Sequence, residues 1–402
     1  MRPTDLLDIV YPYITNDVSP IFANHNWDND FIETWSWKTD ILKAWDSSEQ
    51  RIKLRHPRRT WEYKITASND NRRKLETIIG MRTPRYVFLP VWRDAVHLIS
   101  GLSSGSTIVS CPTTYSEFLV DGFVSIWDSF DHYEIRKINS VGSASITLDY
   151  ATTESFEAGA MIAPCLFGFA RPQKRIDRFT ENVADYSFTV DVLFSPTIGD
   201  MISPTTYNGL TVCPFQPSWN GDQQEDIINA WTRLDRETGI IEYEVTAEEP
   251  EYSRTANFLI SGRANIDIFI RFIHAMAGML TPFYISANER GVELAASASA
   301  GAEEISIKNI GYTNDLFGAN SRSVLYFQKT NGSIFYREIE GSSEDGENEI
   351  LTLDSSLPSD ISAATLNRLT WFEKVRFASD DIQLKWIAHD CFETSIPIAV
   401  LI

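Results

Sequence analysis

The sequence lacks the residue spacings that mark common metal and redox folds. Its four cysteines, at positions 111, 165, 213 and 391, form no CxxC pair, and its six histidines form neither HxH nor HxxxH. These absences argue against zinc-binding and thioredoxin-like motifs. A chain of 402 residues does not depend on disulfides for stability, so we expect reduced, mostly buried cysteines in a protein that folds inside a cell.

The chain is also poor in basic residues and in long apolar runs. It has 35 Lys and Arg residues against 55 Asp and Glu residues, a formal net charge of −20. This charge disfavours binding to nucleic-acid phosphates or to anionic lipid. No segment approaches the roughly 20 apolar residues of a membrane-spanning helix. The early Pro3 and the acidic Asp5 and Asp8 are unlike a signal peptide. The sequence therefore predicts a soluble protein made in the cytoplasm.

Aromatic residues, in contrast, are abundant: 23 Phe, 15 Tyr and 11 Trp make up 12% of the chain. Aromatic side chains favour β-strands, sheet packing and protein interfaces. Hydrophobic residues account for 43% and charged residues for 22%, which is ordinary for a protein with a buried core. The length predicts two or three domains.

An internal duplication is visible when the chain is compared with itself. Residues 80–84 (GMRTP) recur as 278–282 (GMLTP), and each copy follows a helical pattern and precedes an aromatic strand. Five further pairs of similar segments occur in the same order: 20–27 with 214–219, 59–60 with 254–255, 134–138 with 336–339, 145–149 with 349–354, and 186–192 with 382–386. Six matches in order predict two copies of one unit.

Each copy has the same series of predicted elements. We expect a strand, a helix and an aromatic strand at 60–66, 69–80 and 86–89, and again at 255–261, 266–277 and 283–285. The strands show period-two alternation, and the helices show apolar residues on one face. Each helix is expected to end at a glycine, Gly80 or Gly278, because glycine readily adopts the left-handed conformation that follows many helices.

The predicted fold is mainly β: two tandem β-sandwich-like units, each with one helix and a small inserted β-barrel or sandwich domain. The inserts are indicated by short alternating runs broken by Gly, Ser and Asn-Gly. The expected boundaries are an N-terminal arm at 1–17, a first unit at 18–200 with its insert at about 95–165, a linker at 201–212, and a second unit at 213–402 with its insert at about 288–375.

Several short motifs suggest enzymes but lack the context that the chemistry needs. Residues 101–105 (GLSSG) match the GxSxG pattern of serine hydrolases, with Ser103 as the nucleophile. A β-branched run follows, whereas the nucleophile elbow needs a helix there. Acidic pairs at 303–304 and 380–381, the acidic stretch 344–349 and His389-Asp390 are expected to be structural or surface features. We therefore predict no enzyme activity and no catalytic, cofactor-binding or metal-binding residues.

A basic island at residues 49–61 stands out in this acidic chain, and tryptophans at 35, 37 and 45 precede it. Its arginines are expected to stack on aromatic rings or to pair with carboxylates. Two interpretations stay open: the island contributes to a subunit boundary, or it connects strands within one subunit while the tryptophans pack in the core. The candidate interface residues are Arg51, Arg55, Arg58, Arg59, Trp35 and Trp37.

Several of these segments resemble a known family. Residues 49–51 (EQR), 55–59 (RHPRR) and 88–92 (FLPVW), with 235–239 (DRETG) and 281–285 (TPFYI) in the second half, are similar to tail-tip proteins of long-tailed bacteriophages and gene transfer agents. These proteins are relatives of the distal tail protein. The likeness covers about residues 18–400, and its motifs are structural.

The resemblance implies a virion structural protein of the tail tip or baseplate. In that family β-sandwich units form a homo-oligomeric ring, for which a hexamer is one option, and the ring joins the tail tube to hub or fibre proteins. It implies assembly in the host cytoplasm, no catalytic residues and no specificity for nucleic acid. The alternative is a carbohydrate-binding or glycan-degrading tail protein that contacts the host surface. Two carboxylates in a tryptophan-lined cleft would favour that alternative.

Overall fold

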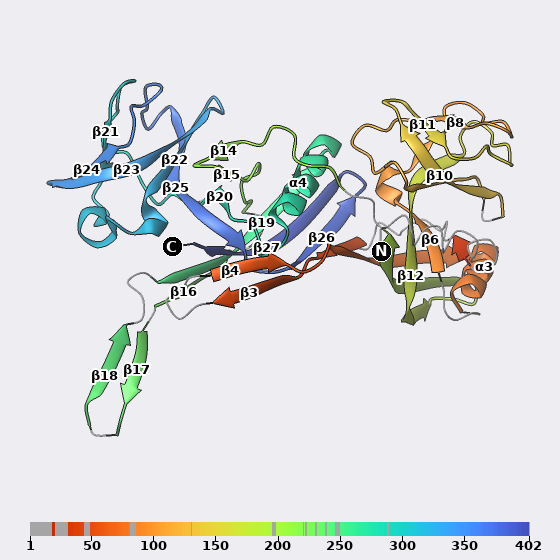
Figure 1. Ribbon diagram of the computed structural model, residues 1–402, viewed down its shortest axis with the longest axis horizontal. Helices are drawn as coiled ribbons and strands as arrows, with labels where there is room; N and C mark the ends of the chain where they lie inside the picture. Colours follow the sequence, from red (N-terminus) through yellow and green to blue (C-terminus); the bar gives the residue numbers. More distant parts are fainter. Residues whose placement is uncertain are drawn as a thin grey trace. The chain divides into compact units, whose positions relative to one another are not determined.

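The computed structural model describes residues 18–20, 31–43, 49–80, 86–129, 131–194, 198–219, 221, 223–229, 231–237, 239–245, 250–287 and 289–401. Within them the chain is mainly β, as predicted, and its sheets are almost entirely antiparallel (Figure 1). The chain forms two compact units. Unit 1 comprises the described residues up to 201 with 259–277 and 380–394, and unit 2 comprises 202–258, 278–379 and 395–401.

The main sheet of unit 1 includes, in order of pairing, β6 (Tyr86–Pro90), β12 (Met161–Arg178), β13 (Val183–Phe194), β5 (Arg58–Ser68), β2 (Phe31–Ser36) and β26 (Asp381–Ala388). A short strand, β1 (Val18–Pro20), runs parallel to β6. Every second residue of β5 is buried, from Arg59 to Ala67. The predicted alternation is therefore confirmed for β5, and it gives this strand one buried and one exposed face.

Both predicted helices are present, at α3 (Asn69–Gly80) and α4 (Arg263–Met276). The apolar face of α4 includes Phe269, Phe272 and Met276, and all three are buried. The end of α4 differs in detail from the expectation: the left-handed conformation begins at Ala277, with φ of 54°, and continues at Gly278, with φ of 67°. A buried alanine thus takes the first position at which glycine is usual.

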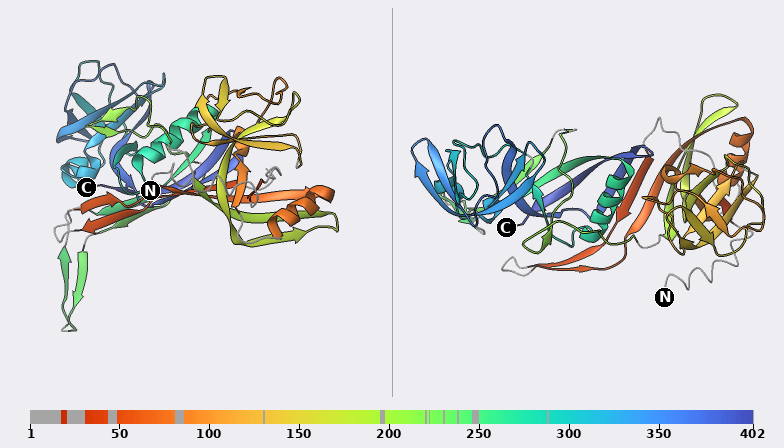
Figure 2. Two further views of the ribbon diagram at one scale, coloured as in Figure 1. Left: turned by 45° about the vertical axis from the view of Figure 1, so that its right-hand side comes forward. Right: turned by 90° about the horizontal axis from the view of Figure 1, so that it is seen from above.

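The insert of unit 1 folds around its own core. Its strands are β7 (Val96–His97), β8 (Ile108–Ser110), β9 (Phe123–Trp127), β10 (Tyr133–Val141) and β11 (Ser145–Leu148). The last four extend the pairing from β12 in the order β9, β10, β11, β8. A bridge between Leu102 and Phe156 lies beside them, and Val109, Ile126 and Ile146 are buried together. Figure 2 shows this compact group of strands in yellow and orange.

Unit 2 repeats the same strand order. Its sheet runs β20 (Phe283–Ser286), β25 (Leu366–Phe377), β27 (Cys391–Val400), β19 (Glu251–Ser261) and β16 (Glu225–Ile228). Its insert continues from β25 through β22 (Val324–Lys329), β23 (Ile334–Asp345), β24 (Asn348–Leu353) and β21 (Glu304–Lys308). A bridge from Ala298 to Ile361 matches the Leu102 to Phe156 bridge of the first insert. The common order supports the duplication inferred from the sequence.

One predicted correspondence shifts by a strand. Comparison of the two halves of the sequence matched residues 186–192, which lie in β13, with residues 382–386, which lie in β26. The strand of unit 2 that pairs like β13 is instead β27, which joins β25 to β19. Strand β26 pairs with β2 and, like α4, belongs to unit 1. The mismatch arises because both strands alternate apolar and polar residues, so the pattern does not distinguish them.

Each repeat also carries a two-stranded hairpin at the same place in its chain order. In unit 1, β3 (Thr39–Lys43) and β4 (Glu49–Lys53) lie between β2 and β5, which pair with each other. In unit 2, β17 (Trp231–Asp235) and β18 (Ile241–Val245) lie between β16 and β19, which also pair. Both hairpins are separate two-stranded sheets. Figure 1 shows β17 and β18 projecting from the rest of unit 2.

The segment 201–212, expected to be a linker, contains a further short hairpin. Strands β14 (Thr206–Tyr207) and β15 (Leu210–Thr211) belong to unit 2, where Tyr207 packs against Tyr284 and Phe372. Three cysteines, Cys111, Cys165 and Cys213, are buried, and Cys391 is partly exposed. The predicted arm at 1–17, Trp45 and the first turn of the repeated motif at 81–85 lie outside the described residues.

Candidate functional site: a buried ion-pair cluster and two exposed hairpins

A buried arginine, Arg59, connects several elements of unit 1. The guanidinium of Arg59 lies over the rings of Trp35 and Trp61, 4.7 Å from each ring centroid. Its Nε donates to Glu33 Oε1 at 2.7 Å, and its two terminal nitrogens donate to the carboxylate of Glu117. Strand pairing places these groups together, because Trp35 lies opposite Arg59 and Glu33 lies opposite Trp61.

A second arginine completes the cluster. Arg93, in the short helical turn η2 (Trp92–Asp94), donates to Glu33 Oε2 at 3.0 Å and to Glu117 Oε2 at 2.8 Å. Its guanidinium stacks on Trp386 of β26, whose Nε1 also donates to Glu33 at 3.0 Å. Each carboxylate therefore contacts both arginines, and two positive charges balance two negative ones.

The protonation states follow from burial and pairing. Burial alone would raise the pKa of the Glu117 carboxyl, but the charges and hydrogen bonds of Arg59 and Arg93 lower it below its usual value. Burial alone would lower the pKa of Arg59, and Glu117 and Glu33 instead raise it. The Glu117 carboxylate and the Arg59 guanidinium therefore stay charged at neutral pH, which makes either group a poor participant in proton transfer.

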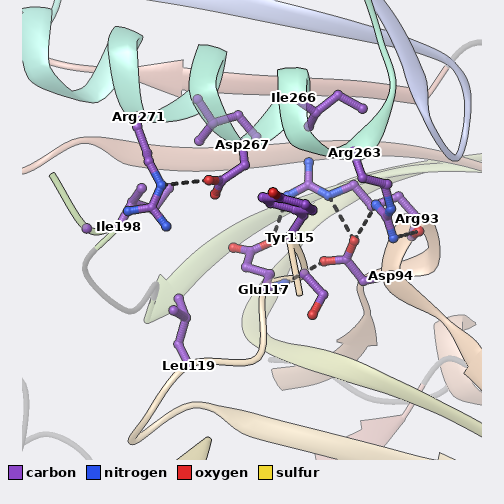
Figure 3. A pocket seen from close by; sticks show the side chains of 13 residues that line it. Arg93, Asp94, Tyr115, Glu117, Leu119, Ile198, Arg263, Ile266, Asp267 and Arg271 are labelled. Atoms are coloured by element: carbon purple, nitrogen blue, oxygen red, sulfur yellow. Dashed lines mark hydrogen bonds and ion pairs between the residues drawn. The ribbon is translucent and has the colours of Figure 1, made fainter. Parts of the chain in front are cut away.

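A small pocket of about 60 Å³ lies beside the cluster (Figure 3). Asp94 Oδ1 lies 2.6 Å from Arg263 Nη1 of α4, an ion pair without hydrogen-bond alignment, and Asp94 Oδ2 accepts from the backbone N–H of Glu117 at 2.8 Å. Burial raises the pKa of Asp94 despite the nearby Arg93 and Arg263. Across the pocket Asp267 pairs with Arg271 at 2.8 Å.

This pocket has room for a few water molecules only. Its acidic side chains Asp94, Glu117 and Asp267 all pair with arginines. The ion pairs connect the η2 turn, the loop before β9 and helix α4, which are far apart in the sequence. We therefore interpret the pocket as part of the structural core of unit 1.

A broader groove of about 380 Å³ lies on the opposite face of the same sheet. It is lined mainly by polar and charged side chains, including Glu62, Lys64, Arg171 and Arg175. Apolar enclosure, which small-molecule sites usually provide, is not a feature of this lining. Neither this groove nor the smaller pocket has a tryptophan in its lining.

Unit 2 contains a related buried cluster. Arg254, the residue that the duplication matches with Arg59, lies 2.6 Å from Glu373, which also contacts Arg322. Arg322 lies over the rings of Tyr252 and Trp371. Glu373 and Arg254 are buried. Both repeats thus place an arginine, a carboxylate and aromatic rings in the core. Of the unit 2 residues, only Arg254 occupies the same strand position as its counterpart in unit 1, Arg59.

The candidate interface residues separate into two groups. Arg59, Trp35 and Trp37 are buried in unit 1, so the interpretation that connects strands within one subunit describes these three. Arg55 is partly buried and donates to the backbone carbonyls of Ser36 and Trp37. Arg58 is exposed, and Arg51 is partly exposed and pairs with Glu49 at 2.7 Å. Only the partly exposed and exposed arginines remain candidates for a subunit boundary.

The enzyme-like motifs occupy unremarkable positions. Ser103 begins a turn, closed by a bond from Ser106 N–H to its carbonyl, and strand β8 follows instead of a helix. Asp380 accepts from the backbone N–H and the hydroxyl of Thr39. The exposed His389 lies 4.0 Å from the partly exposed Asp390. Residues 344–349 span the end of β23, the turn at 346–347 and the start of β24. No cluster of metal-ligating side chains occurs among the described residues.

Sequence reasoning missed most of the buried cluster. Glu33 lies two residues from both Phe31 and Trp35 in β2 and shares their buried face. This period-two spacing could have predicted that Glu33 is buried. Glu117 and Arg93 gave no such signal, because they lie in a loop and a short turn whose placement depends on tertiary contacts. Glu349 was expected in a solvated stretch but is buried, where it accepts backbone N–H bonds from Ile310 and Thr313.

The hairpins β3–β4 and β17–β18 both carry exposed apolar side chains. Trp231 and Tyr243 of the β17–β18 hairpin are 50% and 60% exposed, although their rings contact each other at 5.0 Å. Leu42 and Ile52 of the β3–β4 hairpin are 71% and 62% exposed. No helix among the described residues is long and apolar enough to cross a membrane.

Comparison of the chain with protein-family models gives no match, and comparison with curated protein sequences gives none either.

Proposed function

We propose that this protein is a structural component of the tail tip or baseplate of a long-tailed bacteriophage or gene transfer agent. It forms a homo-oligomeric ring that joins the tail tube to hub or fibre proteins, and it catalyses no reaction. The motif resemblance suggests the family. The structural observation that supports assembly is the duplicated strand order, in which each repeat presents an exposed apolar hairpin at the same position.

Exposed apolar hairpins support assembly because they are costly in isolation. A two-stranded hairpin is at best marginally stable in water unless its apolar side chains pack against something. Exposed apolar patches on soluble proteins commonly mark interaction surfaces. The buried clusters add to this interpretation, because their carboxylates are paired with arginines and are not available for catalysis.

The alternative of a glycan-binding or glycan-degrading protein gains no support from the described pockets. Six tryptophans of the described residues, Trp35, Trp37, Trp61, Trp127, Trp371 and Trp386, are buried in the core. Sugar stacking needs exposed rings beside a cleft, and glycoside hydrolysis needs two available carboxylates. Trp219 and Trp231 are exposed, but neither lines one of the two described pockets.

Self-association of the purified chain tests the proposal. Light scattering coupled to size exclusion, over a range of concentrations, should show a defined oligomer whose mass is a small whole multiple of 45.6 kDa. A mass that stays at one subunit up to about millimolar concentration, where weak specific contacts are populated, would contradict the proposal.

A further inference from the structure

The hairpin β17–β18 is amphipathic. Pairing of Trp231 with Val245, of Arg233 with Tyr243 and of Asp235 with Ile241 places these side chains on one face, because residues directly opposite in a ladder share a face. The intervening pairs, Thr232 with Glu244 and Leu234 with Glu242, occupy the other face. One face is thus mostly apolar and exposed, and the other carries the two glutamates.

One face of the hairpin β3–β4 carries exposed apolar side chains beside Asp40 and Gln50. Leu42 lies on this face with Ile52, and Leu54 follows two residues later in the same direction. All three side chains are exposed. The other face carries Arg51 and Lys53 together with Glu49.

The charge of the two segments differs in sign. Residues 229–250, between β16 and β19, hold six acidic and two basic side chains, whereas residues 37–57, between β2 and β5, hold five basic and three acidic side chains. Two acidic hairpins repel each other, and so do two basic ones. Opposite charge therefore selects the pairing of unlike hairpins.

We propose that hairpin β17–β18 of one copy docks its apolar face on the apolar face of hairpin β3–β4 of a second copy. The proposal rests on the proposed function, because it specifies how copies associate. The contact joins different surfaces of the two copies, so it repeats head to tail and generates a ring when the rotation closes. Docking covers Trp231 and Tyr243 with Leu42 and Ile52, which supplies the packing that each isolated hairpin lacks.

Site-directed crosslinking tests the contact. One chain carries Ile52→Cys and another carries Tyr243→Cys, and the two are mixed under mild oxidation. We expect a covalent heterodimer in the mixture and much less crosslinking in either variant alone or in the wild-type chain. The wild-type control accounts for the partly exposed Cys391. No heterodimer above this background would overturn the proposal.

A chain that carries both substitutions distinguishes docking between copies from docking within one copy. Docking between copies gives a ladder of covalent oligomers on a denaturing gel. Docking within one chain gives a crosslinked monomer of altered mobility and no ladder, and that result would overturn the proposal.

Substitution of the apolar face provides a second measurement. Trp231→Ser with Tyr243→Ser should weaken self-association about tenfold or more, because central aromatic residues dominate interface energy. A matched control, Ile99→Ser with Tyr150→Ser, removes two other exposed apolar side chains and should leave the oligomer unchanged. If the wild type is an oligomer and the hairpin variant associates equally well, the hairpin contact is wrong and the proposed function stands. If the wild type does not associate, both are wrong.

Discussion

Replacement of Arg59 by methionine tests the interpretation of the buried cluster as structural. Methionine retains much of the side-chain volume but leaves Glu33 and Glu117 to share the single charge of Arg93. Removing one member of a buried ion pair costs about 3–5 kcal/mol, because the remaining charge stays buried without full compensation. For a unit of this size, that loss lowers the unfolding temperature by about 6–20 °C.

Thermal unfolding followed by tryptophan fluorescence measures the effect, since Trp35 and Trp61 contact Arg59 directly. The neighbouring Arg58→Met is the matched control: Arg58 is exposed in the same strand, and its loss should change stability by no more than about 0.5 kcal/mol. Combining Arg59→Met with Glu117→Gln should cost less than the sum of the single changes, because it restores charge balance.

The reasoning is refuted if Arg59→Met unfolds within about 2 °C of the wild type, which is less than 1 kcal/mol for a unit of this size. It is also refuted if Arg58→Met is equally destabilising. In either case the ion pairs would contribute little to the stability of unit 1, and the cluster would need another explanation.

Three further predictions follow from single residues. Burial lowers the pKa of His274, which packs against Trp35, to about 4. Because this imidazole takes up a proton below pH 6.5 in the unfolded chain but not in the folded one, the free energy of unfolding should fall by about 3 kcal/mol from pH 6.5 to 4. Urea titrations of His274→Phe should not show this pH dependence. Hydrogen bonds from Tyr186 and arginines lower the pKa of Glu76 to about 2. The ionised carboxylate therefore contributes about 1 kcal/mol to the free energy of unfolding above pH 4.5, and this contribution is lost as the pH falls through 2. Glu76→Gln should remove that acid-induced loss. Ser103→Ala should match the wild type in ester hydrolysis, with both at the buffer rate.

Each of these predictions has a clear contrary result. An unchanged pH dependence in His274→Phe would show that this imidazole is not held neutral by burial. An unchanged acid midpoint in Glu76→Gln would mean that its bonds to Tyr186 and Arg178 do not stabilise α3 on the sheet. Wild-type esterase turnover that Ser103→Ala abolishes would identify an active site.

The local elements were predictable because each depends on its own periodicity. The strand that contains Thr60 to Thr66, the helix from Asn69 to Gly80 and the aromatic strands were found from alternation and capping residues. Short alternating runs predicted the two inserts, and similar segments predicted the duplication; in the structure the strand order of unit 2 follows that of unit 1.

The pairing between distant segments was not predictable in the same way. Strand β26 pairs with β2, which is about 350 residues away in the sequence, and the residues of neither strand indicate which strand it pairs with. The same holds for the cluster, where Glu33, Arg93 and Glu117 meet only after the sheet, the η2 turn and the insert loop have assembled. Hydrophobic periodicity reports which face is buried, whereas the identity of the group that covers that face is a tertiary property.

Electron microscopy of the purified protein, and then of the particles that contain it, tests the central claim most directly. The account predicts closed rings of identical subunits in class averages, and density at the distal end of a tail into which units 1 and 2 can each be fitted. Monodisperse single subunits without rings, together with tail tips whose density accommodates neither unit, would contradict it.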